Sequence, residues 1–253
     1  MKFISELKRR NQLLYWFGLF NLAVAIVCLV LMQGEQKQLL GVNLWLKPFK
    51  FYASVGIMIL TMGWLLHYLN NPAKIKRFSI GLTISMFFEI GLILLQAIRG
   101  TTSHFNVSSG FNSIVFNLMG IFILIFTIIC IRICIAFFQQ KQFTISGSYL
   151  WGIRLGLLFF LIFSLEGGVM LSLLKHTVGG PDGSPGLPVF NWSRQYGDLR
   201  VAHFLGIHSL QLLPLLGYYI TRSSKQMINA AVVYFLIVTF LLIQALRGIP
   251  LFE

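Results

Sequence analysis

The sequence predicts an all-α membrane protein, a bundle of seven transmembrane helices. Composition is the first reason, because 57% of the 253 residues are hydrophobic and only 11% are charged. A soluble domain carries about 25% charged residues. The mean hydropathy of +0.79 agrees with this interpretation. The second reason is that long apolar runs recur along the chain, each close to the ~20 residues that a spanning helix needs.

Seven apolar runs are long enough to cross a membrane. The predicted spans cover residues 12–32, 50–69, 78–98, 113–136, 150–174, 200–220 and 228–247. The first run follows the basic segment MKFISELKRRNQ, as the apolar part of a signal peptide would. It is too long for that role and lacks a cleavage site of small residues. We therefore expect it to be the first membrane helix.

The formal net charge of +13 comes from Lys and Arg residues that lie mostly at the ends of the apolar runs. This placement indicates membrane lipids as partners, and no basic tail or motif points to nucleic acid. The clearest basic clusters lie at residues 8–10 and 74–77. Because cytoplasmic segments are rich in Lys and Arg, these clusters predict a cytoplasmic N-terminus and, with seven spans, an extracytoplasmic C-terminus.

The sequence contains an internal repeat. The third span ends in GLILLQAIRG (91–100) and the seventh in FLLIQALRG (240–248), while the second and sixth spans align Lys50 with Arg200 and Gly56 with Gly206. A linker helix between two halves of three helices gives both halves the same direction in the membrane. We predict a single transmembrane domain over residues 1–253, with repeat halves near 12–98 and 150–247 and a linker helix near 113–136.

This 3+1+3 plan resembles the SWEET sugar transporters and the microbial opsins in topology alone. The seventh span has no Lys that could hold retinal, and no Pro-Gln dipeptide occurs. The segments WLKPFKF (45–51) and RGTTSHFN (99–106), together with the stretch from Gly179 to Gly217, resemble an uncharacterised family of bacterial polytopic membrane proteins. That resemblance implies a location in the bacterial inner membrane and no particular activity.

Three spans carry an ionisable group at a similar expected depth. Counting 1.5 Å per residue from the outer span ends places Glu89, Glu166 and His208 about 12–14 Å below the surface. Ionisable side chains at membrane depth are costly and typical of functional sites. We therefore expect these three side chains to meet, as catalytic or proton-coupling groups. Glu89 and Glu166 are also explained as protonated hydrogen-bond partners between helices.

Polar residues above this layer are expected to form the rim of an outward-facing pocket that binds a small polar or anionic molecule. The candidates are Lys50, Arg99, His104, Asp198, Arg200, His203, Gln211, Gln244 and Arg247. Some of them have simpler explanations. Lys50, Arg99 and Arg247 lie near span ends and suit snorkelling to lipid headgroups, and Asp198 suits the N-cap of a helix.

Two functions suit the polar layer. The first is binding or transport of a small molecule between the two repeats, with Glu89 or Glu166 coupling protons. The second is a membrane-embedded enzyme that uses a metal ion or haem on a lipid or redox substrate, with Glu89, Glu166, His203 and His208 as candidate ligands. The two histidines are five residues apart and no HExxH or GxSxG occurs, which favours the first function. A scaffold or subunit role would need no pocket, and the polar layer disfavours it.

Overall fold

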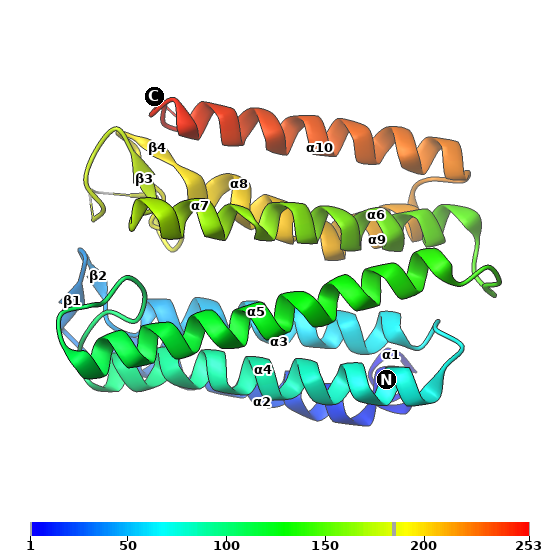
Figure 1. Cartoon of the computed structure of the whole chain (residues 1–253), viewed down its shortest axis with the longest axis horizontal. Coiled ribbons are helices and arrows are strands. Elements are labelled where there is room, and N and C mark those ends of the chain that lie inside the picture. The colour runs from blue at the N-terminus through cyan, green and yellow to red at the C-terminus, as the bar shows by residue number, and fades with distance from the viewer. Residues whose placement is uncertain (1, 184–185, 253) are drawn as a thin grey trace. The chain divides into compact units, whose positions relative to one another are not determined.

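The computed structural model describes residues 2–183 and 186–252, with side chains from residue 4 onward (Figure 1). Ser184 and Pro185, part of the turn-rich loop expected after the fifth span, lie outside the described residues. The described chain is predominantly helical and contains two small two-stranded sheets, which confirms the all-α prediction. It forms two compact units: Met1–Leu39 with Asn43–Lys141 (unit 1), and Leu40–Val42 with Gln142–Glu253 (unit 2).

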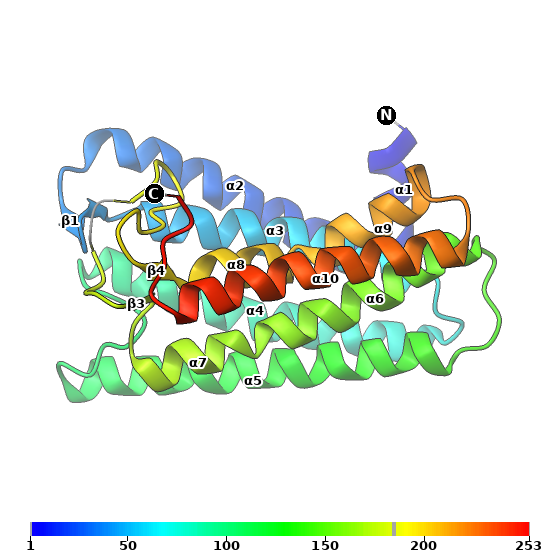
Figure 2. The ribbon, with the colours of Figure 1, turned by 90° about the horizontal axis from the view of Figure 1, so that it is seen from above.

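The long helices of unit 1 run alongside one another in both views (Figures 1 and 2). Its elements are α1 (Lys2–Arg10), α2 (Gln12–Gly34), β1 (Gln38–Leu39), β2 (Val42–Asn43), α3 (Leu46–Leu66), α4 (Pro72–Ile98) and α5 (Gly110–Gln139). α2, α3 and α4 pack on one another, and α5 packs on α4. Asn11, Asn71 and Ser109 begin α2, α4 and α5, because each side-chain oxygen accepts a bond from a first-turn N–H group.

Glycines let α2 and α3 approach closely. A Cβ atom at Gly56 of α3 would lie 3.2 Å from the carbonyl oxygen of Gly18 on α2, and it would also press into Leu22. Small residues permit such close helix crossings in membrane bundles, where packing rather than the hydrophobic effect joins the helices. The pair is therefore the tightly packed part of unit 1.

α5 is a helix of 30 residues that joins unit 1 through one face. Val115 and Met119 pack against Ile93 of α4. Ile114, Ile121 and many other apolar side chains along α5 are exposed, and so is Arg132. An exposed apolar surface on a helix this hydrophobic is typical of contact with lipid.

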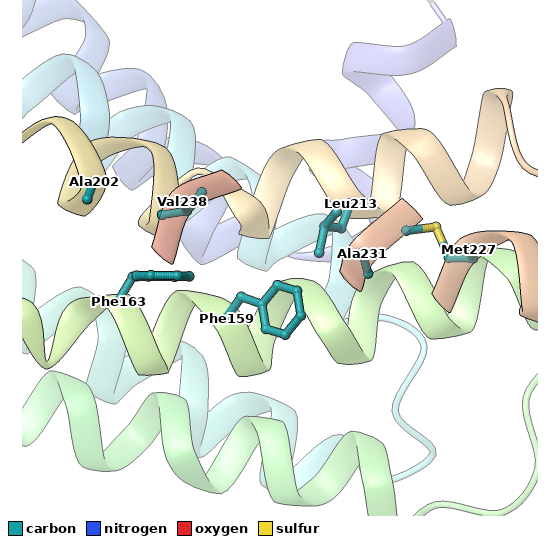
Figure 3. Close-up of a cluster of buried hydrophobic side chains, with 7 residues drawn as sticks. All are labelled: Phe159, Phe163, Ala202, Leu213, Met227, Ala231 and Val238. Carbon is teal, nitrogen blue, oxygen red and sulfur yellow. The ribbon is translucent and has the colours of Figure 1, made fainter. Parts of the chain in front are cut away.

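Unit 2 contains α6 (Gly147–Ser164), α7 (Glu166–Leu173), β3 (Thr177–Val178), β4 (Gly197–Asp198), α8 (Leu199–Ile207), α9 (Ser209–Tyr219) and α10 (Ser224–Leu246). α6 packs on α8 and α9, and α10 packs on α6 and α8. β3 and β4 pair antiparallel, with Thr177 opposite Asp198. Figure 3 shows the apolar core of this unit, to which α6, α8, α9 and α10 contribute. Its buried members are Phe159, Phe163, Ala202, Leu213, Met227, Ala231 and Val238.

α6 and α9 touch backbone to backbone. A Cβ atom at Gly152 would lie 2.5 Å from the carbonyl oxygen of Leu213, and one at Gly156 would lie 2.8 Å from that of Ser209. The two glycines are four residues apart, the spacing that lets one helix seat another in membrane proteins. Ser209 Oγ also donates a 3.0 Å hydrogen bond to the carbonyl of Gly156.

Six described helices are long and apolar enough to cross a membrane, and α8 with α9 makes a seventh candidate if the bent pair is one span. This indicates an integral membrane protein. The helix bounds agree with the predicted spans to within a few residues at most ends. The seven-span count and the 3+1+3 arrangement stay predictions.

One span of unit 2 is bent and another is divided into two helices by a single residue, features that the sequence did not predict. α6 ends at Ser164 and α7 begins at Glu166, with Leu165 between them in helical geometry, and Ser164 Oγ donates to the carbonyl of Phe160 at 2.6 Å. Such back-bonding bends helices. α8 and α9 meet at His208 with a bend of 44°. Pro214 within α9 lacks the N–H group that would bond to the carbonyl of Leu210, which weakens the helix nearby.

α4 and α10 end in the same hydrogen-bonded cap. Gly100 and Gly248 adopt positive φ angles of 69° and 77°, which favour glycine. The N–H groups of Gly100 and Thr101 bond to Ala97 and Gln96, and those of Gly248 and Ile249 bond to Ala245 and Gln244. Both ends are therefore Schellman-type caps. The sequence repeat aligns the residues of these two caps, Gln96 with Gln244, Ala97 with Ala245 and Gly100 with Gly248.

Candidate functional site

The candidate residues divide between the two units. Unit 1 contains Lys50, Glu89, Arg99 and His104. Unit 2 contains the other candidates, namely Glu166, Asp198, Arg200, His203, His208, Gln211, Gln244 and Arg247. A meeting of Glu89 with either Glu166 or His208 therefore stays a prediction, and each unit has its own set of polar groups.

Glu166 is the most isolated acid of unit 2. It is the first residue of α7, directly after the helix break, and only 4% of its surface is exposed. Neither carboxyl oxygen has a hydrogen-bond partner among the described residues. Burying an ionised carboxylate without a partner costs several kcal/mol, whereas a protonated carboxyl avoids most of that cost.

His203 lies at the same helix break. Its Nδ1 atom lies 3.0 Å from the carbonyl oxygen of Phe163, and a carbonyl only accepts, so Nδ1 carries a proton. Its Cε1 atom would lie 3.8 Å from a Cβ atom at Gly167. His203 thus satisfies a backbone carbonyl that the end of α6 leaves open, a role that the sequence did not predict.

His208 occupies the bend between α8 and α9. Its Nδ1 atom lies 3.2 Å from Gln211 Oε1, and its ring lies 4.3 Å from that of Phe204. Because an amide oxygen only accepts, Nδ1 is the protonated nitrogen, and Nε2 is buried without a partner in the described chain. The neighbouring Ser209 contacts Gly156, so His208 lies about 13 Å along α6 from Glu166.

This separation corrects the expectation that Glu166 and His208 share one depth. The expected depths were counted from the ends of the spans. α7 continues to Leu173, well beyond the crossing of α6 with α9, whereas α8 begins much nearer to that crossing. His203, not His208, is the histidine beside the turn that carries Glu166.

Asp198 and Arg200 form an ion pair where β4 joins α8. Arg200 Nε and Nη2 donate to the two carboxylate oxygens at 2.8 and 2.6 Å, and Nη2 also donates to the carbonyl of Asn191. Asp198 is 2% exposed and accepts from the backbone N–H groups of Ser193 and Arg200. The expected N-cap role of Asp198 is confirmed. The anion-binding groups of Arg200 are largely occupied by Asp198.

The loop before β4 contains a second polar pair, which the sequence did not predict. Asp182 Oδ2 lies 2.7 Å from His176 Nδ1, and Asp182 also accepts from the N–H and hydroxyl of Thr177. Burial alone would raise the pKa of Asp182, but the hydrogen bonds from His176 and Thr177 outweigh burial and hold it well below its usual value. The sequence signal that could have indicated this pair is the position of Asp182 among turn residues, six residues after His176 at the end of a span.

Glu89 is the buried acid of unit 1. It lies in α4, is 5% exposed, and its Oε2 atom has no partner among the described residues. Ser85, one turn earlier on the same face, bonds to the carbonyl of Gly81 instead. Unit 1 therefore has a buried acid of its own.

Arg99 sits in a fixed position at the end of α4. Its Nη1 atom donates to Gln96 Oε1 at 2.7 Å and to Asn112 Oδ1 at 2.9 Å. The guanidinium lies over the ring of Phe111, 4.1 Å from its centroid. Gln96 is fully buried and Asn112 is 7% exposed, so the two side chains that hold Arg99 are anchored inside unit 1.

The remaining rim candidates have separate surroundings. Lys47 Nζ lies 3.1 Å from His104 Nδ1, while Lys50 is half-buried on the next turn of α3. Gln244 Nε2 donates to the carbonyl of Pro250, and Arg247 is exposed at the end of α10. Within each unit these residues lie near helix ends, which also fits the snorkelling explanation.

The cavity at the end of α10 is very small. It is lined by Asp198 and Gln244 together with apolar residues, and its volume of about 10 Å³ suits one water molecule. A larger open groove of about 370 Å³ lies beside Val30, Gly34 and Trp45, and it touches no candidate residue. Within unit 2, Asp198 is therefore almost completely buried.

Metal ligands do not gather in the described chain, where no group of three or more His, Cys, Asp or Glu side chains is placed to hold an ion. No protein-family model matches the sequence, and no curated protein or solved structure compared with it matches either. The function must therefore be argued from the geometry alone.

Proposed function

We propose that the chain is an integral membrane protein that binds or transports a small polar or anionic solute, and that Glu166 takes up a proton in this process. The observation that carries the proposal is the burial of Glu166 at a helix break with both carboxyl oxygens unpartnered. An acid in this position is stable when protonated and becomes costly when it loses its proton. Release of the proton therefore requires a local rearrangement or a solute that offers hydrogen bonds.

The interrupted spans of unit 2 support a carrier. Non-helical backbone at membrane depth is tolerated where protein or a solute satisfies it, and discontinuous helices are typical of solute sites in transporters. His208 lies at the 44° bend between α8 and α9, and Glu166 follows Leu165, the single residue between α6 and α7. These are the two residues of unit 2 with unpartnered buried ionisable atoms among the described residues. The break after Ser164 is followed by Gly167 and Gly168, which add backbone freedom.

The repeat is part of the proposal. The matching caps of α4 and α10 support it, and so do the matched glycines. Gly56 faces α2 and Gly206 faces Phe163 of α6, so each lies against the first helix of its own half. On this basis we propose one transmembrane domain with halves near 12–98 and 150–247, joined by a linker helix near 113–136.

Infrared spectroscopy tests the proton on Glu166. We expect the purified chain to show the C=O band of protonated carboxyl groups, and Glu166→Gln to remove part of that band. Glu6→Gln is the matched control. Hydrogen bonds from Arg9 and Arg10 lower the pKa of Glu6 to about 2, so Glu6 is ionised at neutral pH. An unchanged band in Glu166→Gln would contradict the proposal.

Proteoliposomes with an internal pH dye test the coupling. Anionic and polar solutes are added outside, and any solute that causes acidification in the wild type is repeated with Glu166→Gln. We expect proton movement to be lost in this variant and kept in Glu6→Gln. Equal acidification in all three proteins would show that Glu166 is not the coupling group.

The orientation is tested by fusion proteins in a bacterial host. With α8 and α9 as one span, we expect alkaline phosphatase fused after residue 252 to be active and a fluorescent protein fused there to be dark. The same reporters after residue 143, between α5 and α6, give the opposite result, because that loop is expected in the cytoplasm with the N-terminus. Inactive phosphatase at the C-terminus would make α8–α9 a re-entrant segment.

Haem binding is the second candidate, favoured by His208 alone. Its Nδ1 atom is held by Gln211 while Nε2 is left without a partner in the described chain, the arrangement of an oriented imidazole ligand. Protein purified from cells supplied with haem, and lacking a Soret band, would remove this candidate. A band that persists in His208→Ala would remove His208 as the ligand.

A further inference from the structure

The clearest unused binding groups lie at the C-terminal end of α4. Arg99 uses Nη1 for both of its hydrogen bonds, to Gln96 and Asn112. Its other edge, formed by Nε and Nη2, has no partner among the described residues, although the guanidinium carbon lies 4.1 Å from the centroid of the Phe111 ring. A guanidinium edge with two parallel N–H donors fits the two oxygens of a carboxylate or phosphate.

Lys37 adds a second cation at the same helix end. A Cβ atom at Gly100 would collide with Lys37 Nζ, so the ammonium group lies directly against the glycine that follows Arg99. Gly100 also has a φ of +69°, a backbone conformation that favours glycine. No described carboxylate forms an ion pair with Lys37 or Arg99.

The end of the helix explains the charge of these residues but not their geometry. Cations near a helix C-terminus are stabilised by the helix dipole. The last carbonyls of α4, however, are already bonded to the N–H groups of Arg99, Gly100 and Thr101. The helix dipole does not explain why two buried side chains, Gln96 and Asn112, hold Nη1 of Arg99 while its Nε and Nη2 have no partner among the described residues.

We propose that Arg99 and Lys37 form a binding site for an oxyanion, a phosphate or carboxylate group carried by a free solute or by a lipid headgroup. Arg99 binds two oxygens through Nε and Nη2, and Lys37 supplies a point charge. Gln96 and Asn112 are positioning residues, because they hold the guanidinium without touching the anion. This extends the proposed function by naming the ligand class, and it rests on that function only for the idea that a solute is bound.

Thermal unfolding of the full chain in an uncharged maltoside detergent tests the site. Sodium phosphate is titrated against sodium chloride at equal ionic strength, and binding to the folded state raises the Tm in a saturable way. We expect Arg99→Gln to raise the half-saturating phosphate concentration by roughly tenfold or more. Arg247→Gln is the matched control, because Arg247 occupies the same cap position on α10 while the matching Gln244 bonds to Pro250.

Two further variants separate geometry from charge. Arg99→Lys keeps the charge and loses the two parallel N–H donors, and Asn112→Ala keeps the arginine and removes one of the two hydrogen bonds that hold it. Both are expected to weaken phosphate binding, with Tm values in chloride that show whether each protein folds. If Arg99→Gln fails to fold, Arg99→Lys is the deciding variant. An unchanged phosphate affinity in Arg99→Lys would contradict binding of the anion through Nε and Nη2.

A second set of titrations, with lipid present, identifies whether the anion is a free solute or a lipid headgroup. The titration is repeated with phosphatidylglycerol or phosphatidylcholine added to the micelles. A response to inorganic phosphate that Arg99→Gln loses supports a free anion. A response to phosphatidylglycerol alone, again lost in Arg99→Gln, supports a headgroup. Absence of both responses in the wild type, or equal responses in Arg99→Gln, would overturn the site. None of these readouts requires solute uptake, so they stand apart from the tests of Glu166.

Discussion

Replacing Gly152 with leucine is expected to destabilise unit 2 by about 3 kcal/mol. The new side chain would enter the backbone of α9, where even a Cβ atom would lie 2.5 Å from the carbonyl oxygen of Leu213 and 3.1 Å from Cα of Pro214. A backbone cannot turn aside as a flexible side chain can, so α6 and α9 must separate. Unfolding in mixed micelles, followed by circular dichroism, measures the loss.

Gly120→Leu is the matched control for this substitution. Gly120 is an exposed position of α5 with nothing within 4 Å of an added Cβ atom. Leucine is also a better helix former than glycine, so this variant is expected to be unchanged or slightly more stable. Equal stability of the two variants would show that α6 and α9 are not in backbone contact.

Replacing Asp198 with alanine is expected to cost about 3 kcal/mol, because it removes one partner of a buried ion pair. Asp198 is 2% exposed, and its loss leaves the N–H group of Ser193 without its acceptor and Arg200 with only the carbonyl of Asn191. The same unfolding measurement applies. The double variant Asp198→Ala with Arg200→Ala is expected to lose less than the two single losses added together, because no charge is left alone.

Glu6→Ala is the control for Asp198. Glu6 also bonds to two cationic side chains, but its side chain is 27% exposed whereas that of Asp198 is 1% exposed, and ion pairs that are more exposed contribute less. We expect this variant to unfold almost as the wild type does. A loss of stability in Asp198→Ala as small as that in Glu6→Ala would show that the junction of β4 and α8 does not depend on the ion pair.

The positions of the membrane helices could be predicted from the sequence, because hydrophobic length is a local property. The bounds of α2 and of the paired helices α8 and α9 differ little from the predicted spans 12–32 and 200–220. The N-cap role of Asp198 was also predictable, since it depends on the residues that directly follow it.

The surroundings of the polar residues could not be predicted in the same way. His203 bonds to a carbonyl forty positions away, and that carbonyl is open only because α6 ends there. Arg200 was expected to bind a solute, yet Asp198, two residues earlier, occupies it. The boundary between α6 and α7, directly before Glu166, has no proline to mark it. Each of these depends on contacts between helices.

The length of α5 fixes where one face of the bilayer must lie. The hydrocarbon core is about 30 Å thick. Residues 114–131 rise about 27 Å at 1.5 Å per residue, which nearly fills that thickness without a large tilt. Arg132 is exposed and comes directly after them. The last two turns of α5 therefore project into the headgroup layer, where Gln140 at the end of the helix bonds to Tyr68 and Asn70.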